Sequence, residues 1–309
     1  MLHPITHFHF LPSFHFASRF FCLNLQRETI ASMMLAADNN HFPFTTMNYK
    51  LTSLSIGYGN IVIAKNINAT LEAGKMTCLL GPNGAGKSTL LRTLSAFQPC
   101  LGGEMHIGDE SLKALTPQQL SKLIGVVLTE RVSVQGMTVR DMIAMGRSPY
   151  TNFWGKLQDE DNRIVDNAIQ LCGIQNLEAR QISTLSDGER QKVMIAKALA
   201  QQTPIIMLDE PTAFLDFPSK VDTMLLLSRL AHEQQKAILI STHDLDLALQ
   251  TADMLWLMGN HKGESTHESK SVLRVGTPEQ LASDGTLPSF FRSSNIVFDE
   301  LELRFKVAK

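Results

Sequence analysis

The feature that most constrains this chain is a glycine-rich run at residues 81–89, Gly-Pro-Asn-Gly-Ala-Gly-Lys-Ser-Thr. It has the G-x-x-x-x-G-K-[ST] spacing of a phosphate-binding loop. Small residues let consecutive backbone N–H groups point at a phosphate, and the following helix adds its positive N-terminal end. Met76–Leu80 predicts the buried strand that such a loop follows, and Ser88–Ala96 predicts the helix. The residues expected to bind the nucleotide are Gly81, Pro82, Asn83, Gly84, Ala85, Gly86, Lys87, Ser88 and Thr89.

The chemistry of this loop assigns two further roles. A lysine at the position of Lys87 reaches the β- and γ-phosphates of a nucleoside triphosphate. A hydroxyl at the position of Ser88 holds Mg²⁺. The sequence therefore predicts a nucleoside triphosphate and Mg²⁺ as the bound ligands.

The bulk composition narrows the class of protein. Of the 309 residues 44% are hydrophobic, enough for a substantial core. The 28 basic and 30 acidic residues give a net charge of −2, which does not favour nucleic acid as a partner. The four cysteines are scattered and form no C-x-x-C pair, as expected of reduced thiols in a cytosolic protein. No apolar run reaches about 18 residues, so no transmembrane segment is predicted.

Residues 1–46 differ in character from the rest of the chain. Histidine and phenylalanine crowd this segment, which shows neither helical nor strand periodicity. Histidines break its apolar stretch and no positively charged region precedes it, unlike a secretory signal. Metal binding by the histidines is a further alternative. We expect a disordered or spurious extension, and a folded domain over residues 47–309.

From Met47 onward, strand and helix patterns alternate, which predicts an α/β fold with a mostly parallel sheet flanked by helices. The tail from Pro288 alternates apolar and polar residues and is predicted to form a small strand pair. The expected strands are Leu51–Ser55, Ile61–Leu71, Met76–Leu80, Ile124–Leu128, Pro204–Leu208, Ala237–Ser241 and Met254–Met258. The expected helices include Ser88–Ala96, Val139–Met145, Asp159–Leu171, Gln191–Gln201, Ser219–Gln234 and Asp244–Ala252.

A second candidate site follows the apolar run Ile205–Leu208. A buried strand here delivers Asp209 to its C-terminal edge, where parallel sheets bind ligands. There Asp209 can support the Mg²⁺ shell, as the second acid of a phosphate-loop enzyme does. Glu210 comes next and can polarise the water that attacks the γ-phosphate. Two acids that merely cap a strand end are the structural alternative.

A third motif, Leu-Ser-Asp-Gly-Glu-Arg-Gln, opens a helix between the phosphate loop and the acid pair. In this order and spacing, the three motifs resemble the nucleotide-binding subunit of ATP-binding cassette (ABC) transporters. The resemblance covers residues 47 to about 285. It implies a phosphate-loop NTPase core with an antiparallel β subdomain and an α-helical insert at about residues 129–187. A C-terminal tail follows at about residues 286–309.

The resemblance also implies roles for further residues. His243, at a predicted strand end, is similar to the family's γ-phosphate sensor, and Glu210, His243 and Lys87 form the catalytic set. Asp216 is similar to a residue that lies at the seam between the two subunits of the family's dimer. Tyr58 is similar to the aromatic residue that stacks on adenine. The signature residues, which face a nucleotide held by the other subunit, are Leu185, Ser186, Asp187, Gly188 and Glu189.

Two positions depart from the family pattern. Thr129 stands at or beside a position where a glutamine usually helps to hold Mg²⁺. Threonine still offers an oxygen, but with a shorter reach, so the expected metal ligands are Ser88, Asp209 and Thr129. Asp187 and Glu189 replace a usual glycine and glutamine of the signature. A charge at Asp187 is expected to weaken ATP-driven closure unless its side chain turns away.

The resemblance implies a mechanism and partners. Two copies would meet head to tail around two ATP molecules, each between Lys87 of one copy and Ser186 of the other. Two transmembrane permease subunits and an extracytoplasmic solute-binding protein would complete the transporter, with this subunit on the cytoplasmic face of the cell membrane. The segments 136–139 and 146–150 are similar to those of importers for iron–siderophore, haem and vitamin B12. The alternatives are another transporter branch, such as a metal-ion importer, and a soluble ATP-dependent clamp.

Overall fold

The computed structural model describes residues 47–128, 136–151, 155–259, 271–291, 296–299 and 304–307. These residues belong to one compact unit, Phe44–Lys309. The predicted extension at 1–46 and Thr129 lie outside the described residues.

The larger sheet has six strands in the order β10-β9-β3-β8-β7-β6. Strands β9, β3, β8, β7 and β6 pair in parallel, and β10 joins the edge antiparallel to β9. Strands β3 and β8 are buried along their whole length, as expected of parallel strands covered on both faces. The strand bounds are β3 Met76–Leu80, β6 Ile124–Val127, β7 Ile205–Asp209, β8 Ala237–Ser241, β9 Met254–Gly259 and β10 Val272–Gly276.

A second sheet is antiparallel and has the order β2-β1-β4-β5. Its strands are β1 Tyr49–Tyr58, β2 Ile61–Leu71, β4 Gly102–Ile107 and β5 Glu110–Ser111. Helix α2, Lys87–Leu94, packs against both sheets, with Leu90 and Leu94 fully buried in the shared core. The Tyr49 hydroxyl donates a 2.8 Å hydrogen bond to the carbonyl of Leu94. Each buried leucine contributes roughly 1.5–3 kcal/mol, so the helix that follows the phosphate loop is firmly held.

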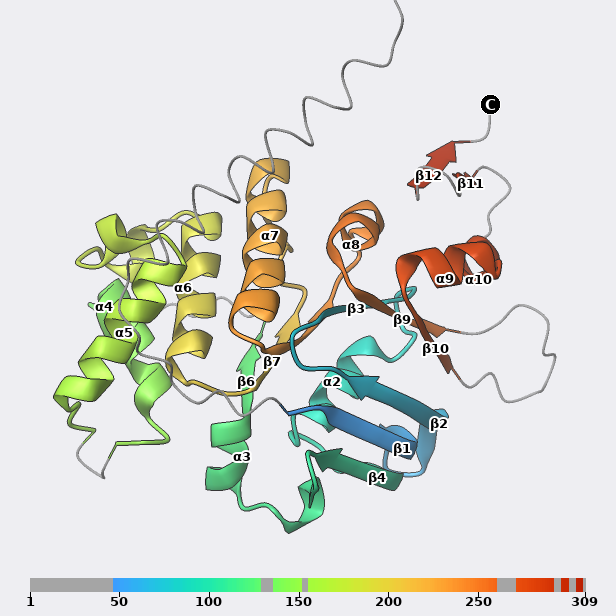
Figure 1. Ribbon diagram of the computed structural model, residues 1–309, viewed down its shortest axis with the longest axis horizontal. Helices are drawn as coiled ribbons and strands as arrows, with labels where there is room; N and C mark the ends of the chain where they lie inside the picture. The colour runs from blue at the N-terminus through green and yellow to red at the C-terminus, as the bar shows by residue number, and fades with distance from the viewer. Residues whose placement is uncertain are drawn as a thin grey trace, which may run out of the picture. The chain divides into compact units, whose positions relative to one another are not determined.

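Helices α4, α5 and α6 pack together beside the β6 edge of the larger sheet (Figure 1). Helix α6 also contacts α7, and α7 contacts β3 and β8. Four helices of the described part begin with capping boxes in which Thr116, Thr138, Ser186 and Thr277 accept from the backbone three residues on. The helix bounds are α3 Pro117–Leu123, α4 Val139–Ala144, α5 Asp159–Leu171, α6 Asp187–Ala200, α7 Phe217–Glu233, α8 Leu245–Thr251, α9 Pro278–Ser283 and α10 Thr286–Phe290. Short 3₁₀ turns are η1 Leu112–Ala114, η2 Met145–Arg147, η3 Gln175–Leu177 and η4 Ile182–Thr184.

The fold class predicted from the sequence is confirmed: a mostly parallel sheet flanked by helices, with a separate antiparallel sheet. Differences are local. The expected tail strand pair forms as β11 Ile296–Asp299 and β12 Arg304–Val307, but α10 occupies the start of that tail. Strands β4 and β10 were not predicted, because their short segments lack a clear alternation of apolar and polar residues. None of the helices in the described part of the chain is long and apolar enough to cross a membrane.

Candidate nucleotide site

The phosphate loop connects β3 to α2 and depends on its glycines. Gly86 has φ 102°, in the left-handed region that favours glycine. At Gly81 a Cβ atom would lie 2.0 Å from the carbonyl oxygen of Met258, at the end of β9. A side chain at Gly81 would therefore push the loop off the neighbouring strand.

Lys87 is buried, with 6% of its surface exposed. Its ammonium donates hydrogen bonds to the carbonyls of Gly81 at 2.8 Å and Pro82 at 3.2 Å. Burial lowers the pKa of Lys87, while the nearby carboxylates of Glu210 and Asp209 raise it. The side chain is thus curled over its own loop and close to both acids, where phosphate oxygens can replace the carbonyls as acceptors.

Ser241 holds both members of the acid pair. The parallel register of β7 and β8 sets Asp209 opposite Ser241. The Ser241 hydroxyl donates to Asp209 Oδ1 at 2.5 Å and accepts from the backbone N–H of Glu210 at 3.0 Å. From the sequence, Ser241 was only the last residue of an expected strand, with no role in the site. A polar residue that ends an apolar strand was the available signal.

Glu210 and His243 face each other, with 2.6 Å between Oε1 and Nε2. Glu210 has φ 47°, a left-handed conformation uncommon for a residue with a side chain. Such strain tends to concentrate where function requires one particular orientation. The structure therefore brings together Lys87, Asp209, Glu210 and His243 at the C-terminal edge of the parallel strands.

Oxygen ligands for Mg²⁺ are available at the same edge. Asp209 offers a carboxylate there, and Ser88 is an exposed hydroxyl in the first turn of α2. Mg²⁺ prefers such hard oxygen ligands and keeps several of its waters, so two protein ligands with phosphate oxygens fit this ion. The third predicted ligand, Thr129, is not among the described residues.

Tyr58 ends β1 beside the phosphate loop. The residue is 48% exposed, and its hydroxyl oxygen accepts a 3.2 Å hydrogen bond from the Thr89 side chain. An aromatic face near the loop is suitable for stacking on a nucleotide base.

The signature segment lies on another element, the N-terminus of α6. Ser186 caps this helix: its hydroxyl accepts from the Glu189 N–H at 3.2 Å, and its own N–H donates to the Glu189 carboxylate at 2.8 Å. The hydrogen bond from the Ser186 N–H to the carboxylate lowers the pKa of Glu189. The Asp187 carboxylate pairs with Arg190 at 3.1 Å, so its charge is directed to a cation on the same helix. Leu185 is buried beneath the turn.

The start of α7 lies beside this segment. A Cβ at Gly188 would come within 3.0 Å of the Ser219 hydroxyl oxygen, which shows how closely the two helices approach. Asp216 caps α7 through a 3.1 Å bond from the Ser219 N–H. Asp216 is exposed, and Phe214 and Phe217 on either side of it are 70% and 69% exposed.

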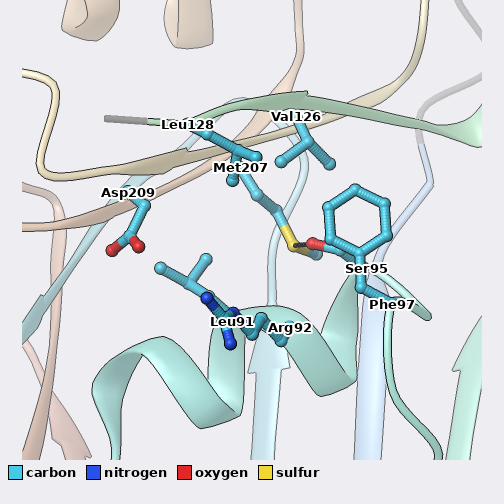
Figure 2. Close-up of a pocket in the computed structure, with 8 residues that line it drawn as sticks. All are labelled: Leu91, Arg92, Ser95, Phe97, Val126, Leu128, Met207 and Asp209. Carbon is cyan, nitrogen blue, oxygen red and sulfur yellow. Dashed lines mark hydrogen bonds between the residues drawn. The ribbon is translucent and has the colours of Figure 1, made fainter. Parts of the chain in front are cut away.

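A pocket of about 100 Å³ opens next to Asp209, between α2 and the ends of β6 and β7 (Figure 2). Its walls are mostly apolar, with Arg92 on the helix side. Leu128 is 42% exposed and Phe97 is 61% exposed. The lining residues are Leu91, Arg92, Ser95, Phe97, Val126, Leu128, Met207 and Asp209.

The phosphate loop between β3 and α2, with an acid at the end of β7, defines a phosphate-loop nucleotide-binding protein. A family model described as ABC transporter matches residues 64–213. An uncharacterized ABC transporter ATP-binding protein of Methanocaldococcus jannaschii is 39% identical, over 82% of this chain and 84% of its own length. The chain therefore belongs to the family of ABC transporter ATP-binding proteins, and it is an ATPase.

The names of other relatives state which compound the transporter imports. The iron(3+)-hydroxamate import ATP-binding protein of Bacillus subtilis is 36% identical, over 74% of this chain and 84% of its own length. The cobalamin import ATP-binding protein of Halobacterium salinarum is 34% identical, over 75% of this chain and 58% of its own length.

Solved structures share the fold. A subunit of an ABC transporter complex from Clostridium perfringens has a TM-score of 0.65 and 26% identity, covering 77% of this chain and 92% of that chain. An ATP-binding cassette solved as a dimer in a post-hydrolysis state with ADP and Pi has a TM-score of 0.57 and 26% identity. That similarity covers 68% of this chain and 93% of the other.

Proposed function

We propose that this ATPase powers an importer of iron chelates (siderophore or haem) or of cobalamin, and that two copies close head to tail around two Mg-ATP. The main observation in favour of the dimer is that the phosphate loop and the signature segment lie on separate parts of one chain. Lys87 begins α2, which packs between the two sheets, whereas Ser186 caps the N-terminus of α6, which packs on α4, α5 and α7. A head-to-tail pair lets each nucleotide use both elements.

The roles of the side chains in hydrolysis follow from their positions. Lys87 binds the β- and γ-phosphate oxygens in place of the loop carbonyls it now contacts. Glu210 accepts a hydrogen bond from the attacking water, which adds in line to the γ-phosphorus as the bond to the ADP oxygen breaks. His243, 2.6 Å from Glu210, donates a hydrogen bond to the γ-phosphate. Ser88 and Asp209 would hold Mg²⁺, with Thr129 as a third candidate, and the ion would neutralise negative charge on the phosphates.

Ser186 supplies the contribution from the other copy. Its exposed hydroxyl accepts from the Glu189 N–H and also interacts with the Glu189 carboxylate, so it would donate to a γ-phosphate oxygen by exchanging the carboxylate for the phosphate. Asp187 opposes this closure less than its charge alone suggests, because its carboxylate is paired with Arg190. Asp216, with Gly188 close to its helix, contacts the opposite copy at the seam.

Two membrane permease subunits and a solute-binding protein complete the proposed importer, with this subunit at the cytoplasmic face of the membrane. The pocket beside Asp209 is the candidate contact for a permease segment, because an apolar opening there adjoins a metal ligand (Figure 2). The iron-chelate and cobalamin cargo is supported by the names of the two import relatives.

A Glu210→Gln variant tests the head-to-tail dimer. It removes the carboxylate that accepts the hydrogen bond from water but keeps the shape of the side chain, so ATP should stay intact and hold two copies together. We expect a shift from monomer to dimer on size-exclusion chromatography with Mg-ATP. The double variant with Lys87→Ala should stay monomeric, because the phosphate contact is lost. A Glu210→Gln protein that remains monomeric at saturating ATP would contradict the head-to-tail dimer.

The same trapped protein tests the importer. Co-purified from gently solubilised membranes, it should bring down a polytopic partner. Uptake of labelled ferric siderophore or cobalamin should require ATP in the complex that contains the wild-type subunit, and should be lost with Glu210→Gln. A partner that moves neither cargo would refute the substrate class. A soluble clamp would recover no polytopic protein.

A further inference from the structure

The turn η2, Met145–Arg147, lies directly on helix α6. A Cβ added at Gly146 would lie 2.3 Å from the carbonyl oxygen of Lys197, which is backbone and cannot move cheaply. Arg147 follows Gly146 and is only 4% exposed. Arginine is rarely buried to this extent unless ion pairs and hydrogen bonds satisfy its guanidinium group.

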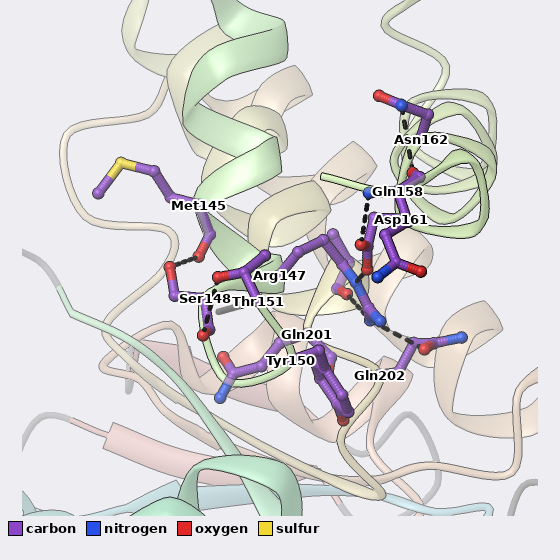
Figure 3. Close-up of polar contacts among 11 residues, drawn as sticks. Met145, Arg147, Ser148, Tyr150, Thr151, Gln158, Asp161, Asn162, Gln201 and Gln202 are labelled. Carbon is purple, nitrogen blue, oxygen red and sulfur yellow. Dashed lines mark hydrogen bonds and ion pairs between the residues drawn. The ribbon is translucent and has the colours of Figure 1, made fainter. Parts of the chain in front are cut away.

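One guanidinium joins two helices at this point (Figure 3). Arg147 Nε donates to Asp161 Oδ1 of α5 at 2.9 Å. Its Nη1 donates to the carbonyl oxygen of Ala200 at 2.8 Å and to Gln202 Oε1 at 2.9 Å, both at the C-terminal end of α6. A cation in this place also satisfies carbonyls that have no partner within the helix.

The contacts of Arg147 with Asp161, Ala200 and Gln202 are called the Arg147 joint below. Tyr150 continues this joint toward the larger sheet. Its ring lies 4.0 Å from the Arg147 guanidinium, and its hydroxyl donates to the Gln201 carbonyl at 3.0 Å. Lys122 of α3 lies over the same ring at 5.2 Å. The Gln201 side chain donates to the carbonyls of Ser121 at 2.6 Å and Ile124 at 3.3 Å, where α3 runs into strand β6.

The joint holds the end of α6 opposite to Ser186. Helix α6 has 14 residues, about 21 Å of rigid rod at 1.5 Å per residue. Because the rod is rigid, a small change of angle at Ala200 displaces Ser186 at the other end. Among the described residues, the hydrogen bonds and ring contacts of Arg147 and Tyr150 involve no residue of the phosphate loop, so we expect their effect on a nucleotide to pass through α6.

We propose that Arg147 is a positioning residue that fixes α6 against the β6 edge of the sheet, so that Ser186 reaches the nucleotide held by a second copy. The proposal rests on the head-to-tail dimer described above. It assigns to Arg147 a role in closure of the dimer and none in binding of ATP by a single copy.

The test uses Arg147→Lys in the Glu210→Gln background. Lysine keeps the charge but lacks the planar fork that serves Asp161, Ala200 and Gln202 together. We expect the ATP concentration for half-maximal dimer formation to rise ~10-fold or more, since displacements of about 1 Å have effects of this size. The dissociation constant of a fluorescent ATP analogue for the monomer should stay within about twofold of the Glu210→Gln value, because no phosphate contact is changed.

Two further variants separate positioning from simple loss of stability. Gly146→Ala pushes η2 off Lys197 without altering a charge and should reproduce the dimerisation defect. Arg140→Lys is the matched control, because the ion pairs of Arg140 join α4 to Asp166 and Glu178 rather than to α6. It should leave dimer formation within about twofold of the background. Tyr150→Phe, which removes only the bond to Gln201, gives a milder readout if Arg147→Lys folds poorly.

The outcomes are distinct. Dimer formation by Arg147→Lys and Gly146→Ala at the background ATP concentration would overturn the proposal while leaving the dimer intact. An equal dimerisation defect in Arg140→Lys would also overturn the proposal, because it would indicate general weakening of the helical layer. A parallel loss of nucleotide binding by the monomer would overturn it as well. If Glu210→Gln alone does not dimerise, the proposed function fails and this inference fails with it.

Discussion

Ser241→Ala should lower the rate of ATP hydrolysis far more than it lowers the stability of the fold. The Ser241 hydroxyl contacts both acids, at 2.5 Å from Asp209 Oδ1 and 3.0 Å from the Glu210 N–H. Alanine removes the donor to Asp209. The Glu210 N–H keeps its second acceptor, the Ser241 carbonyl at 3.1 Å, so the backbone turn should remain.

The magnitude follows from the lost bond. A hydrogen bond to a charged group contributes about 1.5–3 kcal/mol. If that energy is lost in the transition state, where Asp209 must be fixed, kcat falls ~10- to 100-fold, since each 1.36 kcal/mol is a factor of ten. The KM for ATP should change by less, because Lys87 and the loop amides are untouched.

The assay is steady-state release of phosphate at several Mg²⁺ concentrations, with thermal unfolding measured in parallel. Thr77→Val is a suitable control. Thr77 lies in the neighbouring strand β3, is also buried, and its hydroxyl has no hydrogen-bond partner among the described residues. Its loss should leave kcat within about twofold and the midpoint of unfolding equal or higher. A Ser241→Ala enzyme with wild-type kcat at every Mg²⁺ concentration would refute this account of the acid pair.

Two other predictions concern Tyr58 and Lys236. Tyr58→Ala should raise the KM for ATP ~10-fold through loss of base stacking, whereas Tyr58→Phe should have little effect; equal KM values in both would contradict stacking. Burial lowers the pKa of Lys236 to about 8 from 10.5, so below about pH 8 the folded protein carries a buried charge. The unfolded chain binds more protons between these values, so stability should rise with pH there, by on the order of 3 kcal/mol in all. In urea unfolding between pH 7 and 10, the free energy of unfolding should rise less with pH in Lys236→Met than in the wild-type protein. Parallel pH profiles of the two proteins would contradict the shifted pKa.

The sequence predicted those elements whose signals are local. The strand Met76–Leu80 was placed residue for residue, because a short apolar run before a glycine-rich loop has few alternative structures. The acid at the end of β7 was likewise predicted, from the apolar run that precedes it. Helix α6 begins at Asp187, four residues before the predicted start at Gln191, because the Ser186–Glu189 capping box extends it into the signature.

What the sequence by itself determined is the chemistry that each segment can offer: a phosphate loop, two acids after a strand, a capped signature helix and a histidine at a strand end. The tertiary structure decided which of these groups meet. Only the register of β7 on β8 puts Ser241 opposite Asp209, and only the crossing of η2 on α6 brings Arg147 to Ala200. Local patterns report on residues a few positions apart. A contact between residues 32 or 53 positions apart depends on how strands pair and helices pack, and is set by the whole chain.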